Sequence, residues 1–172
     1  VGYDGRISSI NFEKELVKGL SSKGINVYKI GLVPTPLLYF TMYSKKYDSG
    51  IMITGSHNPS NYNGFKMLLK NKSIVGKDIL DLARISSKGI FVNDKKAKIK
   101  KILIKNKYLS FLKNSSNIKK NIKVAWDPGN GSSGEVVSKL IKKIKGKHFI
   151  INGKIDGNFP SHHPDPTVPK NL

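Results

Sequence analysis

The 172-residue sequence contains no cysteine and no long apolar run. The absence of cysteine excludes disulfide bonds and thiolate metal sites, and it fits a protein of a reducing compartment. No stretch approaches the roughly 20 apolar residues that cross a bilayer, and the first residues do not resemble a signal peptide. We therefore expect a cytoplasmic protein with no membrane partner.

Acidic residues and arginine are also scarce. The 31 Lys and Arg residues outnumber the 11 Asp and Glu residues, giving a formal net charge of +20, but only Arg6 and Arg84 are arginines. Such a charge is compatible with a basic nucleic-acid-binding module. Arginine is the preferred side chain for bidentate recognition of phosphates and bases, however, and the lysines here are scattered among Ile and Asn residues. We favour a codon bias toward A and T, and expect no nucleic-acid partner.

Short apolar runs alternate with helix-like segments along the first part of the chain. Phe12, Leu16 and Leu20 fall at helical spacing, and Gly24 supplies a stop. Thr35-Pro36 place a capping hydroxyl ahead of a proline suited to a first helical turn. The expected strands are residues 1–3, 25–30, 50–54 and 65–69, and the expected helices are residues 12–20, 37–43 and 78–87. This alternation predicts an α/β fold with a largely parallel sheet.

A second unit follows a change in composition. Residues 89–107 are lysine-rich and weakly patterned, residues 108–112 indicate part of a helix, and residues 114–117 are polar. The strands expected beyond them are residues 122–126 and 148–151, on either side of a helix at residues 135–144. We predict two domains, at residues 1–117 and 118–172.

The loop after the strand at residues 50–54 is the most informative for function. Ligands of α/β sheets gather at such strand ends. Gly55 removes a side chain before Ser56, and Asn58-Pro59 turns the chain away, so we expect an exposed Ser56 hydroxyl on a constrained loop. This hydroxyl suits a nucleophile or phosphoryl carrier, beside His57 for proton transfer and Lys66 for phosphate. Residue chemistry alone leaves an ordinary tight turn open.

This loop also carries a family resemblance. Thr54-Gly-Ser-His-Asn-Pro59, followed by Asn63-Gly-Phe-Lys66, resembles the phosphoserine loop of the α-D-phosphohexomutases, the family of phosphomannomutases and phosphoglucomutases. Other segments that resemble family motifs, in the same order, are Val1-Gly-Tyr-Asp-Gly-Arg6, Gly31-Leu-Val-Pro-Thr-Pro36, Asp127-Pro-Gly-Asn-Gly131, Asp156-Gly-Asn-Phe-Pro160 and His162-His-Pro-Asp-Pro166. Only Tyr3 departs, from a basic residue common there. The resemblance thus covers nearly the whole chain.

The resemblance implies a fold and a reaction. The fold would be a layered mixed sheet with helices on both faces, forming domain 1 and the start of domain 2 of a four-domain chain. Ser56 would carry a phosphoryl group and help to hold Mg²⁺, with His57 and Lys66 lining the reaction centre. Hexose 1-phosphates and 6-phosphates would interconvert through a hexose 1,6-bisphosphate.

The family's Asp-Gly-Asp-Gly-Asp metal loop has no counterpart in the sequence. We therefore expect the remaining Mg²⁺ ligands, and the residues that choose between mannose and glucose, downstream of this chain. As an N-terminal fragment, the chain alone is expected to be inactive.

A glycine motif supports a rival hypothesis. Gly129, Gly131 and Gly134 match the spacing of a dinucleotide-binding turn, and Asp156 lies about 20 residues further on. Pro128 interrupts the junction of strand and turn, and Asp156 lies beyond the end of the next expected strand, so we favour a structural turn. A dinucleotide-binding oxidoreductase fragment stays the alternative.

Two further features have simpler interpretations. We expect Arg6 to be structural, as an ion-pairing residue at a strand end. His162 and His163 are adjacent and would point to opposite faces of a strand, which favours a packing or surface role over a metal site.

Overall fold

The computed structural model describes residues 1–70, 72–89, 97–118 and 121–171. Its main sheet has five strands, in the order β3 (Gly31–Leu32), β1 (Gly2–Tyr3), β4 (Ser49–Ile53), β5 (Phe65–Leu69) and β6 (Lys72–Ser73). β1 pairs in parallel with β3 and β4, whereas β4 with β5 and β5 with β6 are antiparallel. The sheet is mixed rather than largely parallel because a hairpin loop, not a crossover helix, joins β4 to β5.

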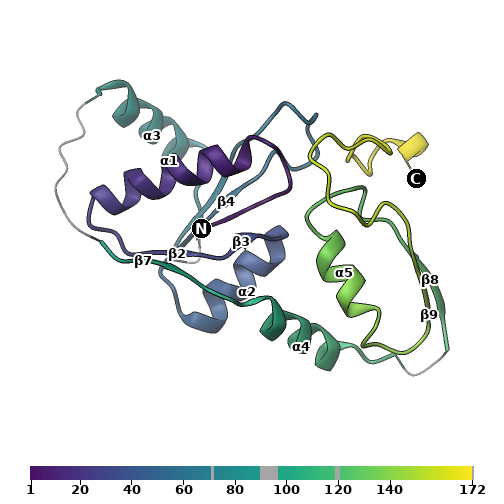
Figure 1. Ribbon diagram of the computed structural model, residues 1–172. Coiled ribbons are helices and arrows are strands. Elements are labelled where there is room, and N and C mark those ends of the chain that lie inside the picture. Colours follow the sequence, from purple (N-terminus) through teal and green to yellow (C-terminus); the bar gives the residue numbers. More distant parts are fainter. Residues whose placement is uncertain (71, 90–96, 119–120, 172) are drawn as a thin grey trace.

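Helices cover both faces of this sheet. Figure 1 shows α1 (Ser9–Ser22) and α3 (Lys77–Ser87) on one side, and α2 (Thr35–Lys45) and α4 (Lys105–Ser115) on the other. The α/β fold with helices on both faces is therefore confirmed. Within the described ranges, no helix combines the length and apolar character needed to cross a membrane.

Two helices differ in detail from the sequence expectations. The buried residues of α1 are Ser9, Glu13 and Val17, four apart, whereas Phe12 is 42% exposed. Helix α2 begins at Thr35, and its N-cap residue is Pro34. No side chain makes a capping hydrogen bond at this end of the helix, so the expected capping role of Thr35 is wrong. The proline at the second helical position lies in the first turn as expected.

A second parallel pair extends beside the sheet. β2 (Val27–Lys29) pairs with β7 (Ile99–Lys101). β2 confirms an expected strand, but β7 lies in the stretch thought to be weakly patterned. Its three residues are all exposed and two are lysines, so no apolar alternation marks it. Residues 90–96 of that stretch lie outside the described residues.

The second unit consists of two parallel strands and one helix. β8 (Lys123–Trp126) and β9 (Lys147–Ile150) are joined through α5 (Gly134–Leu140), and the chain ends in the 3₁₀ turn η1 (Pro169–Asn171). All three predicted elements are present. α5 ends earlier than the predicted residue 144, just ahead of the lysine-rich segment 142–145 and Gly146, where the chain turns toward β9.

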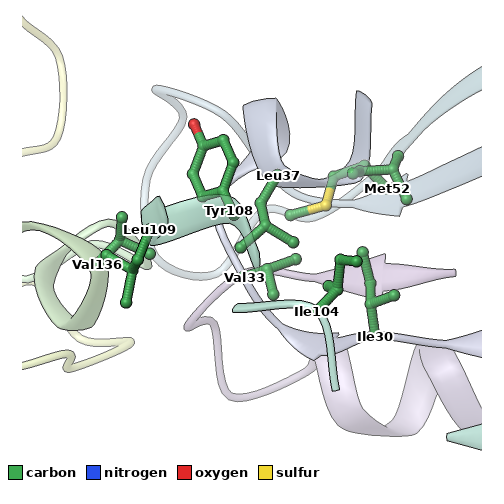
Figure 2. Packing of buried hydrophobic residues seen from close by; sticks show 9 residues of the cluster. Ile30, Val33, Leu37, Met52, Ile104, Tyr108, Leu109 and Val136 are labelled. Carbon is green, nitrogen blue, oxygen red and sulfur yellow. The ribbon is translucent and has the colours of Figure 1, made fainter. Parts of the chain in front are cut away.

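One apolar cluster joins the two units (Figure 2). Leu37 of α2 lies between Met52 of β4 at one end of the cluster and Leu109 of α4, which is beside Val136 of α5, at the other. Burying each such side chain contributes about 1.5–3 kcal/mol. Because α4 contacts both α2 and α5, the second unit is packed against the first and shapes the space between them.

Candidate functional site

The loop between β4 and β5 presents Ser56 in a constrained conformation. Ser56 is exposed, and its φ of +53° lies in the left-handed region. Its N–H donates to Thr54 Oγ1 at 2.9 Å, and the N–H of Asn58 donates to the carbonyl of Gly55 at 3.0 Å. A left-handed conformation costs a residue with a Cβ roughly 1–2 kcal/mol, so other contacts must hold the loop.

Arg6 supplies those contacts. Its Nε donates to the carboxylate of Asp4 at 3.1 Å, which confirms the predicted ion pair. The four other N–H donors bond carbonyl oxygens of the loop, which are those of Ser56 (3.0 Å), Asn58 (2.7 Å), Pro59 and Tyr62 (3.0 Å). Arg6 is 1% exposed, and all five donors of its guanidinium are therefore used inside the protein.

This role of Arg6 was missed because it depends on residues far along the chain. The local signal in the sequence is Gly55. A Cβ atom added at this glycine would lie 2.5 Å from Cζ of Arg6 and 2.7 Å from the carbonyl oxygen of Tyr62. Only glycine fits where the loop crosses the guanidinium. The sequence showed the glycine without showing what approaches it.

A buried polar network fixes the far end of the loop. The Ser9 hydroxyl donates to Asp4 Oδ1 at 2.7 Å, and Asn63 Nδ2 donates to the hydroxyls of Ser8 and Ser9 at 2.9 Å each. Asn63 Oδ1 in turn accepts from the N–H of Gly64 at 2.9 Å. The loop is thus held by Arg6 near Ser56 and by Ser8 and Ser9, at the start of α1, near Asn63.

The hairpin brings the predicted site residues to one place. Lys66 of β5 pairs opposite Met52, and its Nζ lies 3.4 Å from Ser56 Oγ, a long hydrogen bond between exposed groups. His57 is exposed and lines the same cavity. Ser56, His57 and Lys66 are therefore neighbours, and their chemical roles stay predictions.

A cavity of about 710 Å³ lies between this loop and the second unit. The first unit contributes Ser56, His57 and Lys66 to its lining, whereas the second contributes Asp127, Phe159 and His162. The volume of this cavity is large enough for a small polar ligand. Since its two walls come from different units, the space exists only when the units are packed together.

Asp127 and His162 form an ion pair in the second wall. His162 Nε2 lies 3.0 Å from Asp127 Oδ2, and its Nδ1 lies 3.0 Å from the carbonyl oxygen of His163. The hydrogen bonds to the His163 carbonyl and to Asp127 raise the pKa of His162. Partial burial opposes ionisation of Asp127, but bonds from the Gly129 N–H, His162 and Asn152 outweigh it and lower its pKa.

His162 and His163 lie in an irregular segment, so the expectation that they point to opposite faces of a strand is wrong, although His162 does pack against its neighbours. A Cβ on Gly129 would lie 3.0 Å from its ring, so the imidazole rests on the turn after β8. Among the residues that the structure describes, no group of three or more His, Cys, Asp or Glu side chains is placed to hold a metal ion.

The glycine motif is explained by the protein's own contacts. Gly129 has a φ of +54°, an added Cβ on Gly131 would lie 2.9 Å from the Pro128 carbonyl oxygen, and one on Gly134 would lie 2.1 Å from that of Gly153. The carboxylate of Asp156 accepts from the N–H of Asn158 at 2.9 Å, within its own turn. These are the features of a structural turn.

Comparison with known proteins agrees with this geometry. Residues 1–104 match the family model for phosphoglucomutase/phosphomannomutase alpha/beta/alpha domain I, and residues 106–172 match the model for domain II. The chain belongs to the phosphoglucomutase/phosphomannomutase family. The resemblance stated from the motifs is confirmed, and the dinucleotide-binding alternative is not supported. These matches meet at residue 105, and the division after residue 117 stays a prediction.

Relatives in this family extend well beyond the chain. A phosphoglucomutase of Neisseria gonorrhoeae is 40% identical over 100% of this chain and 38% of its own length. A phosphomannomutase/phosphoglucomutase of Pseudomonas putida is 38% identical over 100% of this chain and 37% of its own. The crystal structure of a family protein from Burkholderia thailandensis superimposes with a TM-score of 0.91 at 34% identity, covering 99% of this chain and 39% of that one. The chain thus spans under two fifths of these relatives.

Proposed function

We propose that the protein containing this chain is a phosphohexomutase, an isomerase that interconverts hexose 1-phosphates and 6-phosphates. The supporting observation is the Ser56 hydroxyl, exposed at the cavity on a loop held by Arg6, with Lys66 Nζ 3.4 Å from Oγ. The relatives named phosphoglucomutase and phosphomannomutase/phosphoglucomutase favour this reaction class.

The proposed reaction has two phosphoryl transfers. A hydroxyl oxygen of the hexose monophosphate forms a bond to the phosphorus carried on Ser56 while the bond to Ser56 Oγ breaks, and the hydroxyl proton passes to a base. The resulting hexose 1,6-bisphosphate turns over, and its other phosphoryl group returns to Ser56 Oγ while a proton returns to the sugar oxygen. One serine thereby divides a difficult transfer into two easier steps.

The side chains around Ser56 suit parts of this chemistry. The ammonium of Lys66 is placed to neutralise charge on the transferring phosphoryl group, and His57 is an accessible proton carrier. The guanidinium of Arg6 is not available for phosphate, because all its donors already bond Asp4 and the loop. We therefore assign Lys66 and His57, rather than Arg6, to the reacting groups.

The described residues do not by themselves fit a Mg²⁺ ion. The charged side chains that bond Ser56 are the cations Arg6 and Lys66, and the described residues hold no group of three or more His, Cys, Asp or Glu side chains placed to bind a metal ion. We propose that this chain contributes to Mg²⁺ binding only through phosphorylated Ser56, with its other ligands outside the chain.

The proposed partners are hexose phosphates and hexose 1,6-bisphosphate, in the cytoplasm. The scattered lysines and the scarcity of arginine favour neither a nucleic-acid nor a membrane partner. We expect the residues that choose between mannose and glucose to lie outside this chain.

Phosphopeptide mapping tests the assignment of Ser56. We expect mass spectrometry of the intact, purified protein to find phosphate on Ser56 and none on Ser60, an exposed serine of the same loop. The Ser56 phosphate should be lost when the protein is incubated with a hexose monophosphate in excess, as the group passes to the sugar. Phosphate on Ser60 alone, or a fully active protein that is unphosphorylated at Ser56 throughout turnover, would contradict the proposal.

A further inference from the structure

The ring of Phe159, from the second unit, lies over the guanidinium that holds the Ser56 loop. The Cζ atom of Arg6 is 5.0 Å from the centroid of this ring. The side chain of Arg6 has no exposed surface, so the contact is shielded from water. A guanidinium in such a position is attracted by the negative face of an aromatic ring, and more strongly than on an exposed surface.

The backbone around Phe159 is shaped to place this ring. Phe159 has a φ of +51°, a conformation that is unusual for a bulky side chain and costs free energy. The turn is held by the Phe159 N–H, which donates to the Asp156 carbonyl at 3.1 Å, and by the Asn158 N–H, which donates to the Asp156 carboxylate at 2.9 Å. These hydrogen bonds therefore hold Phe159 in an unfavourable backbone conformation, as is common at functional positions.

The same turn fits closely against the segment that carries Arg6. An added Cβ on Gly157 would lie 2.6 Å from the carbonyl oxygen of Gly5 and 3.0 Å from Cα of Arg6. An added Cβ on Gly5 would lie 2.6 Å from the side chain of Ile155. The segment 155–159 and the segment 5–6 are thus in contact along their backbones, and the ring contact is one part of a shaped interface.

We propose that Phe159 is a positioning residue for Ser56, acting through Arg6. The ring fixes the plane of the guanidinium, and this plane sets the directions in which its N–H groups meet the carbonyls of Ser56 and Asn58. Docking of the second unit therefore orders the loop that presents the phosphoryl carrier. That this ordering serves catalysis rests on the proposed function of Ser56. The structural coupling between Phe159 and the Ser56 loop does not depend on that function.

Hydrogen exchange measured by mass spectrometry on the intact protein tests this coupling. The readouts are the amides of Ser56, Asn58 and Tyr62, each of which donates within the loop. In Phe159→Leu we expect these amides to exchange about tenfold faster, the change expected from losing one shielded cation–π contact. Phe159→Met, which keeps the volume but has no ring, should behave alike, whereas Phe159→Tyr should stay within about twofold of wild type.

Phe149→Leu is the matched control, because Phe149 belongs to the same unit, lies on β9 and is 59% exposed. It should leave loop exchange unchanged. Unchanged loop exchange in Phe159→Leu and Phe159→Met would overturn the proposal, as would an equal acceleration of the β4 amides, which would show that Phe159 only stabilises the whole fold. Hydrogen exchange is measured without turnover. A failure of this proposal can therefore be distinguished from a failure of the proposed phosphoryl transfer at Ser56.

Discussion

At the scale of single residues, the Ser56 loop depends on a buried charge. Arg6 is stabilised by Asp4, and it donates to four carbonyl oxygens of the loop. Removing one partner of such a buried network costs more than the bond itself contributes, because the remaining groups stay desolvated. Lys66 instead presents an exposed ammonium at the cavity, where we propose that it meets the phosphoryl group.

The ion pair between His162 and Asp127 gives a prediction for pH. The raised pKa of His162 means that its protonated form adds stability below the ordinary value of 6.5, and that this stability is lost as the pH rises through the raised value. The lowered pKa of Asp127 means that its carboxylate adds stability above the ordinary value of 3.8, and that this is lost as the pH falls through the lowered value. Asp127 and His162 are therefore both charged between the lowered pKa of Asp127 and the raised pKa of His162.

NMR titration of the imidazole protons measures this directly. We expect the pKa of His162 to lie above 6.5 in the wild type and to fall toward it in Asp127→Asn. Asp78→Asn on α3, which changes an exposed carboxylate away from the cavity, should leave the His162 titration unchanged. An identical pKa in Asp127→Asn and wild type would show that the contact does not exist in solution.

At the scale of elements, the helices and strands that have a recognisable local sequence pattern could be predicted. The strands β4 and β5 and the helices α1 and α2 have enough residues for periodicity to appear, and their order placed Ser56 on a loop at a sheet edge. β6 and β7 are short and all their residues are exposed, so no apolar alternation marks them in the sequence. The contacts of Arg6 with the loop, and of Phe159 with Arg6, join residues far apart in the chain. Gly55 marked a close approach in the loop, but no local pattern could identify the residue that approaches it.

The start of α5 gives a prediction for close packing. Gly134→Ala should lower the free energy of unfolding by about 1–3 kcal/mol, because the new methyl group would overlap the carbonyl of Gly153. Gly19→Ala is the control, since Gly19 is exposed in α1 and an added Cβ meets nothing within 4 Å. That change should raise stability by about 0.5–1 kcal/mol through helix propensity. Denaturant unfolding of both variants checks this, and a stabilising Gly134→Ala would contradict the described packing.

At the scale of the whole molecule, the two units line one cavity. The core passes from Leu37 through Leu109 to Val136, and the cavity has the Ser56 loop on one side and Asp127 with His162 on the other. Family membership, shown by matches over both units, explains why these walls belong together. The chain spans 38% of the length of the Neisseria gonorrhoeae relative, and we propose that the metal and sugar contacts lie in the part of the protein outside this chain.

The most direct test of this mechanism is mutase turnover of Ser56→Ala in the intact protein, compared with Ser60→Ala in the same loop. We expect Ser56→Ala to lose turnover by orders of magnitude, because alanine has no atom that can hold the phosphoryl group. Both variants should unfold within about 0.5 kcal/mol of wild type, since each removes an exposed loop hydroxyl. Ser60→Ala should keep near-normal turnover. Near-normal turnover of Ser56→Ala would contradict the mechanism and leave the loop as an ordinary structural turn.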